Sequence, residues 1–215
     1  MLKKILITAG PTREMLDPVR FLSNLSTGEM GYTLARMAQA RGYHVTLISG
    51  PTALQPPSGV KFISIMSAEE LQCACRKEFP KQDALVMSAA VCDFTVASRH
   101  PQKIQRTKIR SLQLRQTPDI VAGLAKKKGK RIVIGFCLET VDWLERAGEK
   151  LRRKGLDGIV ANYYQKGHVP FGNRRINAAF LDHRTTRLLK KQSKSQVSLA
   201  LLRWLETLSK KSVKN

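Results

Sequence analysis

The stretch DALVMSAAV, residues 83–91, is the strongest indication of the fold in this chain. It is a nearly continuous apolar run of strand length, as a central parallel strand needs when helices bury both of its faces. Other apolar or alternating runs of similar length lie before and after it. We therefore expect strands over residues 3–9, 44–49, 61–66, 83–91, 131–139 and 156–162.

Helical patterns alternate with these strands. Ser67 and Glu70 have the spacing of a capping box, which predicts a helix from there to about residue 79. Further helices are expected over 28–41, from Pro118 with Thr117 as its cap, and over 140–154. This alternation predicts an α/β protein with a Rossmann-like three-layer fold and a mostly parallel central sheet.

Residues 94–116 interrupt the alternation, because they are basic and contain a short alternating run. We interpret them as a strand and loop excursion from the sheet. After residue 162, a strand over 177–182 should pair with a basic strand near 185–190, and a helix should cover 195–208. The sequence shows no repeat and no linker, so we expect one domain over residues 1–215.

The composition is that of a soluble globular protein, with 42% hydrophobic and 25% charged residues among 215. No apolar run approaches the roughly 20 residues of a membrane span. The first residues, MLKKILITAG, are faintly similar to a signal peptide, but GPTRE interrupts the apolar run at once. We expect a cytoplasmic protein that does not enter a membrane.

The cysteines and the net charge limit the chemistry. The four cysteines have neither disulfide nor metal-site spacing, so we expect reduced and mostly buried thiols and no protein-bound metal. The formal net charge of +22 indicates an anionic partner, such as nucleic acid, a membrane surface or phosphorylated small molecules. The charge does not choose among these classes.

The segment RFLSNLSTGEMG, residues 20–31, lies between a predicted strand and a predicted helix. Hydroxyl and amide side chains can cap the open N–H groups of a helix, and glycine allows a close approach to the backbone. Such a helix start can bind a phosphate. The same residues can form a capped turn without a ligand, and the segment alone leaves both interpretations open.

A dinucleotide site is not indicated. No G-x-G-x-x-G motif follows the first strand, where the glycines are Gly10, Gly28 and Gly31. The second strand ends in Ile48-Ser49-Gly50, where a ribose-binding acid would be expected. A Rossmann-like fold alone does not imply dinucleotide binding.

Eight segments in order resemble one family, and they span roughly the first four-fifths of the chain. They are ITAGPTRE (7–14), LDPVRFLSNLSTGEMG (16–31), AAVCDF (89–94), KIQR (103–106), TPDIV (117–121), IGFCLET (134–140), KLRRKGLD (150–157) and IVAN (159–162). The chain thereby resembles phosphopantothenate–cysteine ligase, also called phosphopantothenoylcysteine synthetase, of coenzyme A biosynthesis. Because Met1 lies almost on the first strand, we expect the free-standing form of this enzyme.

The resemblance implies a reaction in two steps. The carboxylate of 4′-phosphopantothenate attacks the α-phosphate of CTP, with Mg²⁺ on the phosphates, and the amine of L-cysteine then displaces CMP. ATP takes the place of CTP in eukaryotic relatives. The family also implies a homodimer whose excursion near residues 94–116 covers the partner's site, and a flavin-dependent decarboxylase as a possible separate partner.

The resemblance also assigns roles to individual residues. Asn24 and Lys103 are implied to be catalytic, and Arg20 and Asn24 to bind the substrate. Nucleotide binding is implied for Gly10, Ser26, Thr27, Gly28, Met87, Ser88, Ala89, Asp93, Lys103, Pro118, Asp119, Ile120, Val121, Phe136, Lys150 and Lys154. The chain departs from the family pattern at Glu29 and Gln105, where lysine is common.

Several of these residues have simpler interpretations. Asn24 can be a helix cap, Asp93 a turn residue, Phe136 a core residue, and the lysines solvated side chains. Two other functions also stay open. A basic nucleic-acid-binding protein is suggested by charge alone and lacks interleaved aromatic residues, and an inactive relative would share the fold without the chemistry.

Overall fold

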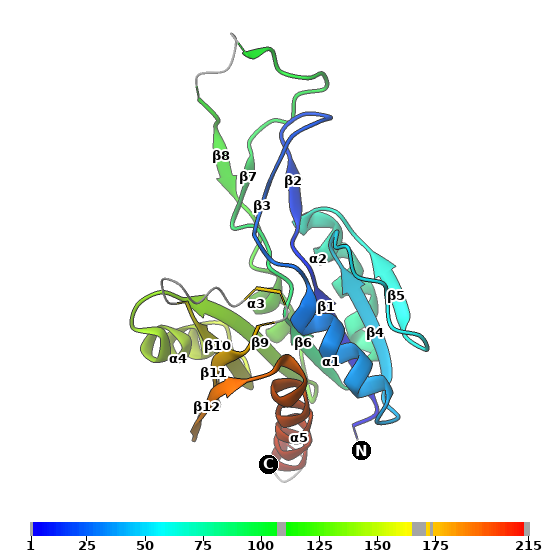
Figure 1. Cartoon of the computed structure of the whole chain (residues 1–215), viewed down its shortest axis with the longest axis vertical. Coiled ribbons are helices and arrows are strands. Elements are labelled where there is room, and N and C mark those ends of the chain that lie inside the picture. The colour runs from blue at the N-terminus through cyan, green and yellow to red at the C-terminus, as the bar shows by residue number, and fades with distance from the viewer. Residues whose placement is uncertain (1, 107–110, 165–170, 173, 213–215) are drawn as a thin grey trace.

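The computed structural model describes the chain except for residues 1, 107–110, 165–170, 173 and 213–215. Its centre is an eight-stranded sheet (Figure 1). In spatial order the strands are β12 (Thr186–Gln192), β11 (Ile176–Leu181), β10 (Gly158–Tyr163), β9 (Ile132–Glu139), β6 (Ala84–Met87), β1 (Lys4–Ala9), β4 (His44–Ser49) and β5 (Lys61–Ser64). The run from β10 to β5 is parallel, and β11 and β12 are antiparallel additions.

Helices cover both faces of the sheet. Along β1, Ile5 and Ile7 face a core shared with α1 (Glu29–Gln39) and α5 (Lys194–Ser212). Leu6 faces the opposite core, which contains residues of α2 (Ala68–Glu78), α3 (Ile120–Ala125) and α4 (Trp143–Arg153). A short 3₁₀ turn, Phe79–Lys81, follows α2. The predicted three-layer α/β fold with a mostly parallel sheet is therefore confirmed.

The order of the parallel strands creates a switch point between β1 and β6. From β1 the chain moves outward through β4 to β5, and from β6 it moves the other way through β9 to β10. Ligands of open α/β sheets bind outside the carboxyl ends of the strands at such a point. The crevice here begins after Ala9 in β1 and Met87 in β6.

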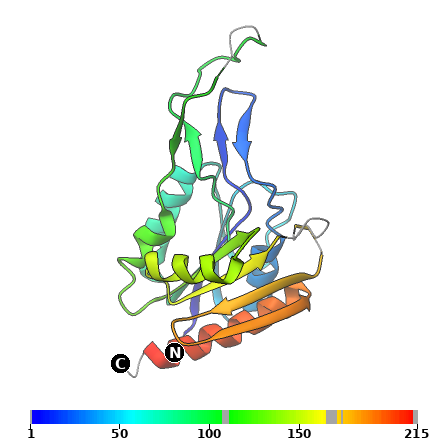
Figure 2. The same cartoon turned by 90° about the vertical axis from the view of Figure 1, so that its left-hand side faces the viewer.

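Two small hairpins stand away from the sheet, and we call them together the arm. One pairs β2 (Arg13–Met15) with β3 (Phe21–Ser23), and the other pairs β7 (Phe94–Val96) with β8 (Leu114–Gln116). Both project side by side, at the end of the molecule opposite the two termini (Figures 1 and 2). The excursion predicted over 94–116 thus holds a hairpin, with its residues 107–110 outside the described part, while the first hairpin was not predicted.

Local hydrogen bonds explain where the predicted boundaries were wrong. Thr117 does not cap α3, because its hydroxyl donates to the Cys92 carbonyl over 2.5 Å. Asp119 is the cap instead, and its Oδ1 accepts the Ala122 N–H over 3.1 Å. Strand β6 ends at Met87 rather than at residue 91. Met87 and Thr8 are its last ladder pair with β1, and beyond them side-chain bonds of Ser88 and Thr8 replace the ladder.

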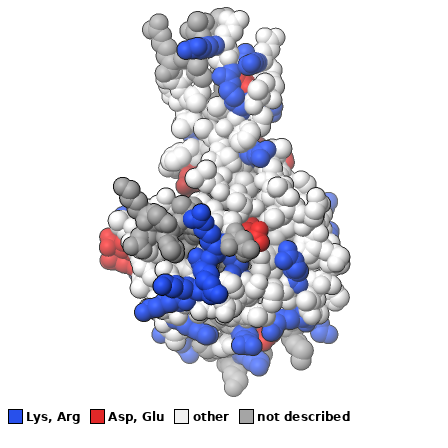
Figure 3. Space-filling model, viewed as in Figure 1, with Lys and Arg blue, Asp and Glu red and all other residues white. Residues whose placement is uncertain are grey.

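Charge is spread widely over the molecule. On the face shown in Figure 3, Lys and Arg side chains occur on both the arm and the body, and acidic groups are few. In the part of the chain that the structure describes, no helix has the length and apolar character needed to span a bilayer.

Candidate active site

Gly10 and Gly28 bring the end of β1 against the start of α1. Both adopt positive φ angles, 69° and 79°, which favour glycine. A Cβ atom on Gly28 would lie 3.3 Å from Cα of Gly10, so these glycines allow two backbone segments to meet. Thr52 and the Gly50 carbonyl lie closer still, so the two glycines let the end of β1, the start of α1 and the loop after β4 meet at the mouth of the switch-point crevice.

The first turn of α1 has no side-chain cap in the structure. Ser26 Oγ accepts the N–H of Gly28 over 3.3 Å, and Thr27 Oγ1 accepts that of Gly172 over 3.3 Å. Neither hydroxyl therefore caps the helix, but the Ser26–Gly28 bond closes a local turn, so a capped turn precedes a helix start that has no side-chain cap. The uncapped N–H groups and the helix dipole together suit an anion at this end.

Asn24 lies in the segment between β3 and α1, where its side chain reaches the backbone that follows β6. Its Nδ2 donates to the Ala90 carbonyl over 3.1 Å, and Ala90 N–H donates to the Gly10 carbonyl over 2.9 Å. The side chain is exposed, and within the described residues only this one contact holds its amide. The second Nδ2 proton can therefore donate to a ligand in the crevice.

The segment Met87–Ala89 forms the β6 side of the crevice. Ser88 Oγ donates to the Thr8 carbonyl over 2.5 Å, and Thr8 Oγ1 accepts the N–H of Ala89 over 3.1 Å. These contacts fix the backbone of the segment against β1. Asp93 follows with an exposed side chain.

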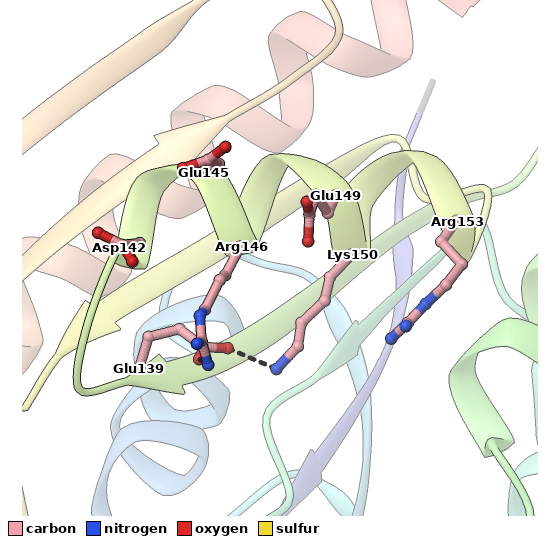
Figure 4. Close-up of a pocket in the computed structure, with 7 residues that line it drawn as sticks. All are labelled: Glu139, Asp142, Glu145, Arg146, Glu149, Lys150 and Arg153. Carbon is pink, nitrogen blue, oxygen red and sulfur yellow. Dashed lines mark hydrogen bonds and ion pairs between the residues drawn. The ribbon is translucent and has the colours of Figure 1, made fainter.

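The lysines of α4 lie on the side of the sheet that α3 and α4 cover. Lys154 pairs with Asp119 over 3.1 Å, and Lys150 pairs with Glu139 over 2.5 Å. Figure 4 shows Lys150 and Arg146 both pointing toward Glu139, with Arg146 Nη1 3.9 Å from it. A hollow of about 420 Å³ lies along this part of α4.

Glu139 was not predicted to belong to the site. Its side chain is only 8% exposed, and it ends β9 at the carboxyl edge of the sheet. An acidic residue at the end of a buried strand was the signal available in the sequence.

Other predicted nucleotide residues contribute backbone or core. Ile120 and Val121 are buried in the core on the α3 and α4 side, while Pro118 is exposed. Phe136 packs against the other core, with α1 and α5, because alternate residues of β9 face opposite sides. The structure thus places its ring on the opposite face of the sheet from Lys150.

Arg20 and Lys103 lie at the far end of the arm. Strand β3 separates Arg20 from Asn24, a span of roughly 13 Å in extended chain. Arg20 and Lys103 instead line a hollow of about 400 Å³ together with Ile104, Gln105 and Arg106. Within one chain, the structure does not bring these cations to Asn24.

The thiols do not form a reactive site. Cys75 and Cys92 are buried, and Cys73 and Cys137 are more accessible. Burial raises the pKa of the Cys137 thiol to about 11, and burial likewise raises that of Cys92. Among the described residues, no group of three or more His, Cys, Asp or Glu side chains could hold a metal ion.

The fold and this geometry define a doubly wound α/β protein with a candidate anion site at the switch point of its sheet. The family described as DNA/pantothenate metabolism flavoprotein C-terminal domain matches residues 1–208, and the chain belongs to this family.

Individual relatives agree with this assignment. The coenzyme A biosynthesis bifunctional protein CoaBC of Bacillus subtilis (strain 168) is 40% identical over 213 residues, which are 98% of this chain and 52% of that protein. The crystal structure of the C-terminal domain of a CoaBC protein superposes with a TM-score of 0.83 and 33% identity, over 97% of this chain and 96% of that one.

A more distant structure shares the fold. It is a Cab2 mutant in complex with phosphopantothenate-cysteine, with a TM-score of 0.77 and 20% identity, over 98% of this chain and 88% of that one. The chain spans about half the length of the curated relatives it matches.

Proposed function

We propose that the protein is a ligase that joins 4′-phosphopantothenate to L-cysteine in coenzyme A biosynthesis. In the first step a carboxylate oxygen attacks the α-phosphorus of CTP, the bond to the β-phosphate breaks, and pyrophosphate leaves. In the second step the cysteine amine attacks the acyl carbon, loses a proton, and CMP leaves. The product is 4′-phosphopantothenoylcysteine.

The placement of Asn24 carries this proposal. A neutral amide with one proton held by Ala90 and a second one available is suited to donate to an acyl oxygen as negative charge develops there. It lies beside the uncapped start of α1, where a phosphate group would be stabilised. The family membership supports the same chemistry.

The nucleotide would lie along the carboxyl edge from the Met87–Ala89 segment toward α4. Lys150 and Lys154 are one turn apart and both reach this edge, so they are suited to the charge of a triphosphate. Mg²⁺ typically uses one or two carboxylates together with substrate phosphates, and exposed Asp93 can supply such a carboxylate. When bound, the metal would neutralise phosphate charge.

The test is a reaction followed in two stages. Purified protein is mixed with 4′-phosphopantothenate, CTP and Mg²⁺, and cysteine is added later, while pyrophosphate and products are measured by mass spectrometry. We expect pyrophosphate first, then CMP and the product, and a parallel reaction with ATP gives the nucleotide preference. Asn24→Asp should accumulate the acyl-cytidylate. No turnover with either nucleotide by folded protein would refute the ligase proposal.

We further propose that the active form is a homodimer in which the arm of one chain completes the site of the other. Lys103 and Asn24 belong to one reaction in this family but lie apart within one chain. The arm also exposes apolar side chains, with Phe21 41% and Phe94 51% exposed. Exposed apolar groups of this kind are suited to an interface.

Mixed dimers test this arrangement. Asn24→Asp and Lys103→Ala chains should each retain only a small residual rate of product formation alone. If each site takes Asn24 from one chain and Lys103 from the other, unfolding and refolding the two together should restore about a quarter of the activity, because half of the dimers contain one intact site. Mixtures that stay inactive would indicate that both residues act from the same chain.

We expect a flavin-dependent decarboxylase to be a separate partner of this enzyme in the same biosynthesis. We expect both proteins in the cytoplasm. Co-purification from a lysate, with the arm variant Phe94→Ser as a control for the dimer, tests the association. A decarboxylase that never co-elutes would contradict it.

A further inference from the structure

We propose that Asp17 is a positioning residue for Lys103, because its carboxylate holds the Lys103–Ile104 segment against the turn that carries Arg20. This inference rests on the proposed ligase function for its consequences in catalysis. The contact itself is a property of the arm and can be tested without any substrate.

The two carboxylate oxygens of Asp17 have different partners. Oδ1 accepts the N–H groups of Val19 and Arg20, over 2.8 and 2.9 Å, and so closes the turn between β2 and β3. Oδ2 accepts the N–H of Ile104 over 3.2 Å, from a residue 87 positions later in the chain. One oxygen thus serves the local turn, and the other serves the second hairpin.

Arg20 completes the contact. Its Nη2 lies 2.7 Å from Oδ2 of Asp17 and donates to the Ile104 carbonyl over 2.6 Å. Both backbone groups of Ile104 are therefore fixed, one by the carboxylate and one by the guanidinium. Because Ile104 follows Lys103 directly, Arg20 and Lys103, two of the three cations that line the hollow of about 400 Å³, are held as one unit.

Asp17 is buried, and donors surround its carboxylate. The residue is 0% exposed, although its neighbour Val19 is 59% exposed and the arm stands away from the body. A buried carboxylate is destabilising unless donors surround it, and here each oxygen has two. Burial works to raise the pKa of Asp17, but three backbone N–H groups and Arg20 outweigh it and lower the pKa to about 2.

Asp182 provides an internal comparison. Its Oδ1 accepts the N–H groups of Arg184 and Thr185, both over 2.8 Å, in the same sequence spacing as the turn of Asp17. Its Oδ2 accepts from the Thr185 hydroxyl of its own turn and from Trp204. Asp182 thus closes a turn outside the arm and does not contact the described residues of either hairpin of the arm.

The experiment compares Asp17→Asn with Asp182→Asn as the matched control. An amide keeps one oxygen for the turn but presents an NH₂ group where Oδ2 accepts from Ile104 and Arg20. Hydrogen exchange at the Ile104 amide should accelerate roughly tenfold in Asp17→Asn, as expected for one lost hydrogen bond, and stay unchanged in Asp182→Asn. Asp17→Ser, which keeps a turn acceptor and lacks the second oxygen, repeats the test if the first variant folds poorly.

The catalytic consequence is measured in the first step alone. Pyrophosphate release without cysteine should slow by roughly 100-fold in Asp17→Asn, because a misplaced charge fails to meet the transferring group. Aminolysis of acyl-cytidylate supplied to the variant should keep its rate. In a Lys103→Ala background, Asp17→Asn should add little further loss, since both changes remove the same interaction.

Unchanged exchange at Ile104 would overturn the contact. Losses that multiply with those of Lys103→Ala, or an equal slowing of both steps, would show that Asp17 merely stabilises the arm. If the wild-type protein fails to turn over any substrate, the ligase proposal falls and with it the catalytic role, while exchange at Ile104 still decides whether Asp17 holds the segment.

Discussion

Replacing Gly31 by alanine should destabilise the protein, although alanine is the better helix former. Gly31 lies in the first turn of α1, directly against β1 and β6. A Cβ atom there would lie 2.6 Å from Cβ of Ala9, 2.8 Å from Oγ of Ser88 and 3.0 Å from the Thr8 carbonyl oxygen. None of these neighbours is the end of a long flexible side chain, so the helix itself must move away from the crevice.

The magnitude follows from two opposing effects. Overpacking a core by one methyl group costs about 1–3 kcal/mol, and replacing glycine by alanine inside a helix gains up to about 1 kcal/mol. Gly148, in the equally long helix α4, is the matched control. A Cβ atom there would meet Nη1 of Arg152 at 3.5 Å, an ordinary contact with a flexible group. Gly148→Ala should therefore keep the helical gain without the overpacking.

Thermal unfolding followed by circular dichroism measures both variants under one set of conditions. We expect Gly31→Ala to be less stable than wild type by about 1–2 kcal/mol and Gly148→Ala to be more stable by about 0.5–1 kcal/mol. A difference of about 2 kcal/mol corresponds to roughly 4–8 °C in Tm for a chain of this size. Shifts of both variants in the same direction would refute the packing argument.

Three further outcomes follow from individual side chains. Iodoacetamide at pH 8 should label exposed Cys73 before Cys75, whose burial raises its pKa to about 12, and equal labelling in a mass spectrum would contradict this. Glu139→Gln should lower the free energy of unfolding by about 1–3 kcal/mol, because Lys150 loses its charged partner. This value lies between those of exposed and buried ion pairs. Urea unfolding measures it, and an unchanged midpoint would count against the ion pair. Because the pKa of Asp17 is lowered from 3.8 to about 2, its ionised form stabilises the fold above pH 4, and that contribution is lost as the pH falls from about 4 to 2. An acid titration of Asp17→Asn should be flatter than that of wild type in this range.

The sequence predicts the body of the molecule better than the arm. Strand β4 has its predicted bounds of 44–49, because Gly42 before it and Gly50 after it mark the turns at both ends. Strands β2 and β3 are three residues each, which is too short for an alternation to be recognised. They also pair outside the sheet, so the pattern of the surrounding elements does not indicate them.

The ion-pair partners of the site lysines are less predictable than the lysines themselves. The lysines of α4 were expected to share a helix face, which depends only on helical spacing. Their acidic partners come from other elements, Glu139 from the end of β9 and Asp119 from the start of α3. Such pairs depend on tertiary packing. The side of the sheet that Phe136 faces depends on its position in the alternation of β9, because successive side chains of a strand point to opposite faces. A local motif does not show which face that is.

Glu29 illustrates the same limit at the proposed phosphate position. By resemblance, lysine is common at this place, so the sequence suggests an unfavourable negative charge beside the start of α1. In the structure α1 packs along α5, whose first residue, Lys194, is 6% exposed. Its Nζ donates to the carbonyls of Gly172 and Arg174. Burial lowers the pKa of Lys194, and the nearby charge of Glu29 opposes that shift. The carboxylate therefore faces a cation from a helix that begins 165 residues later, and the charge beside this helix start cannot be inferred from the motif alone.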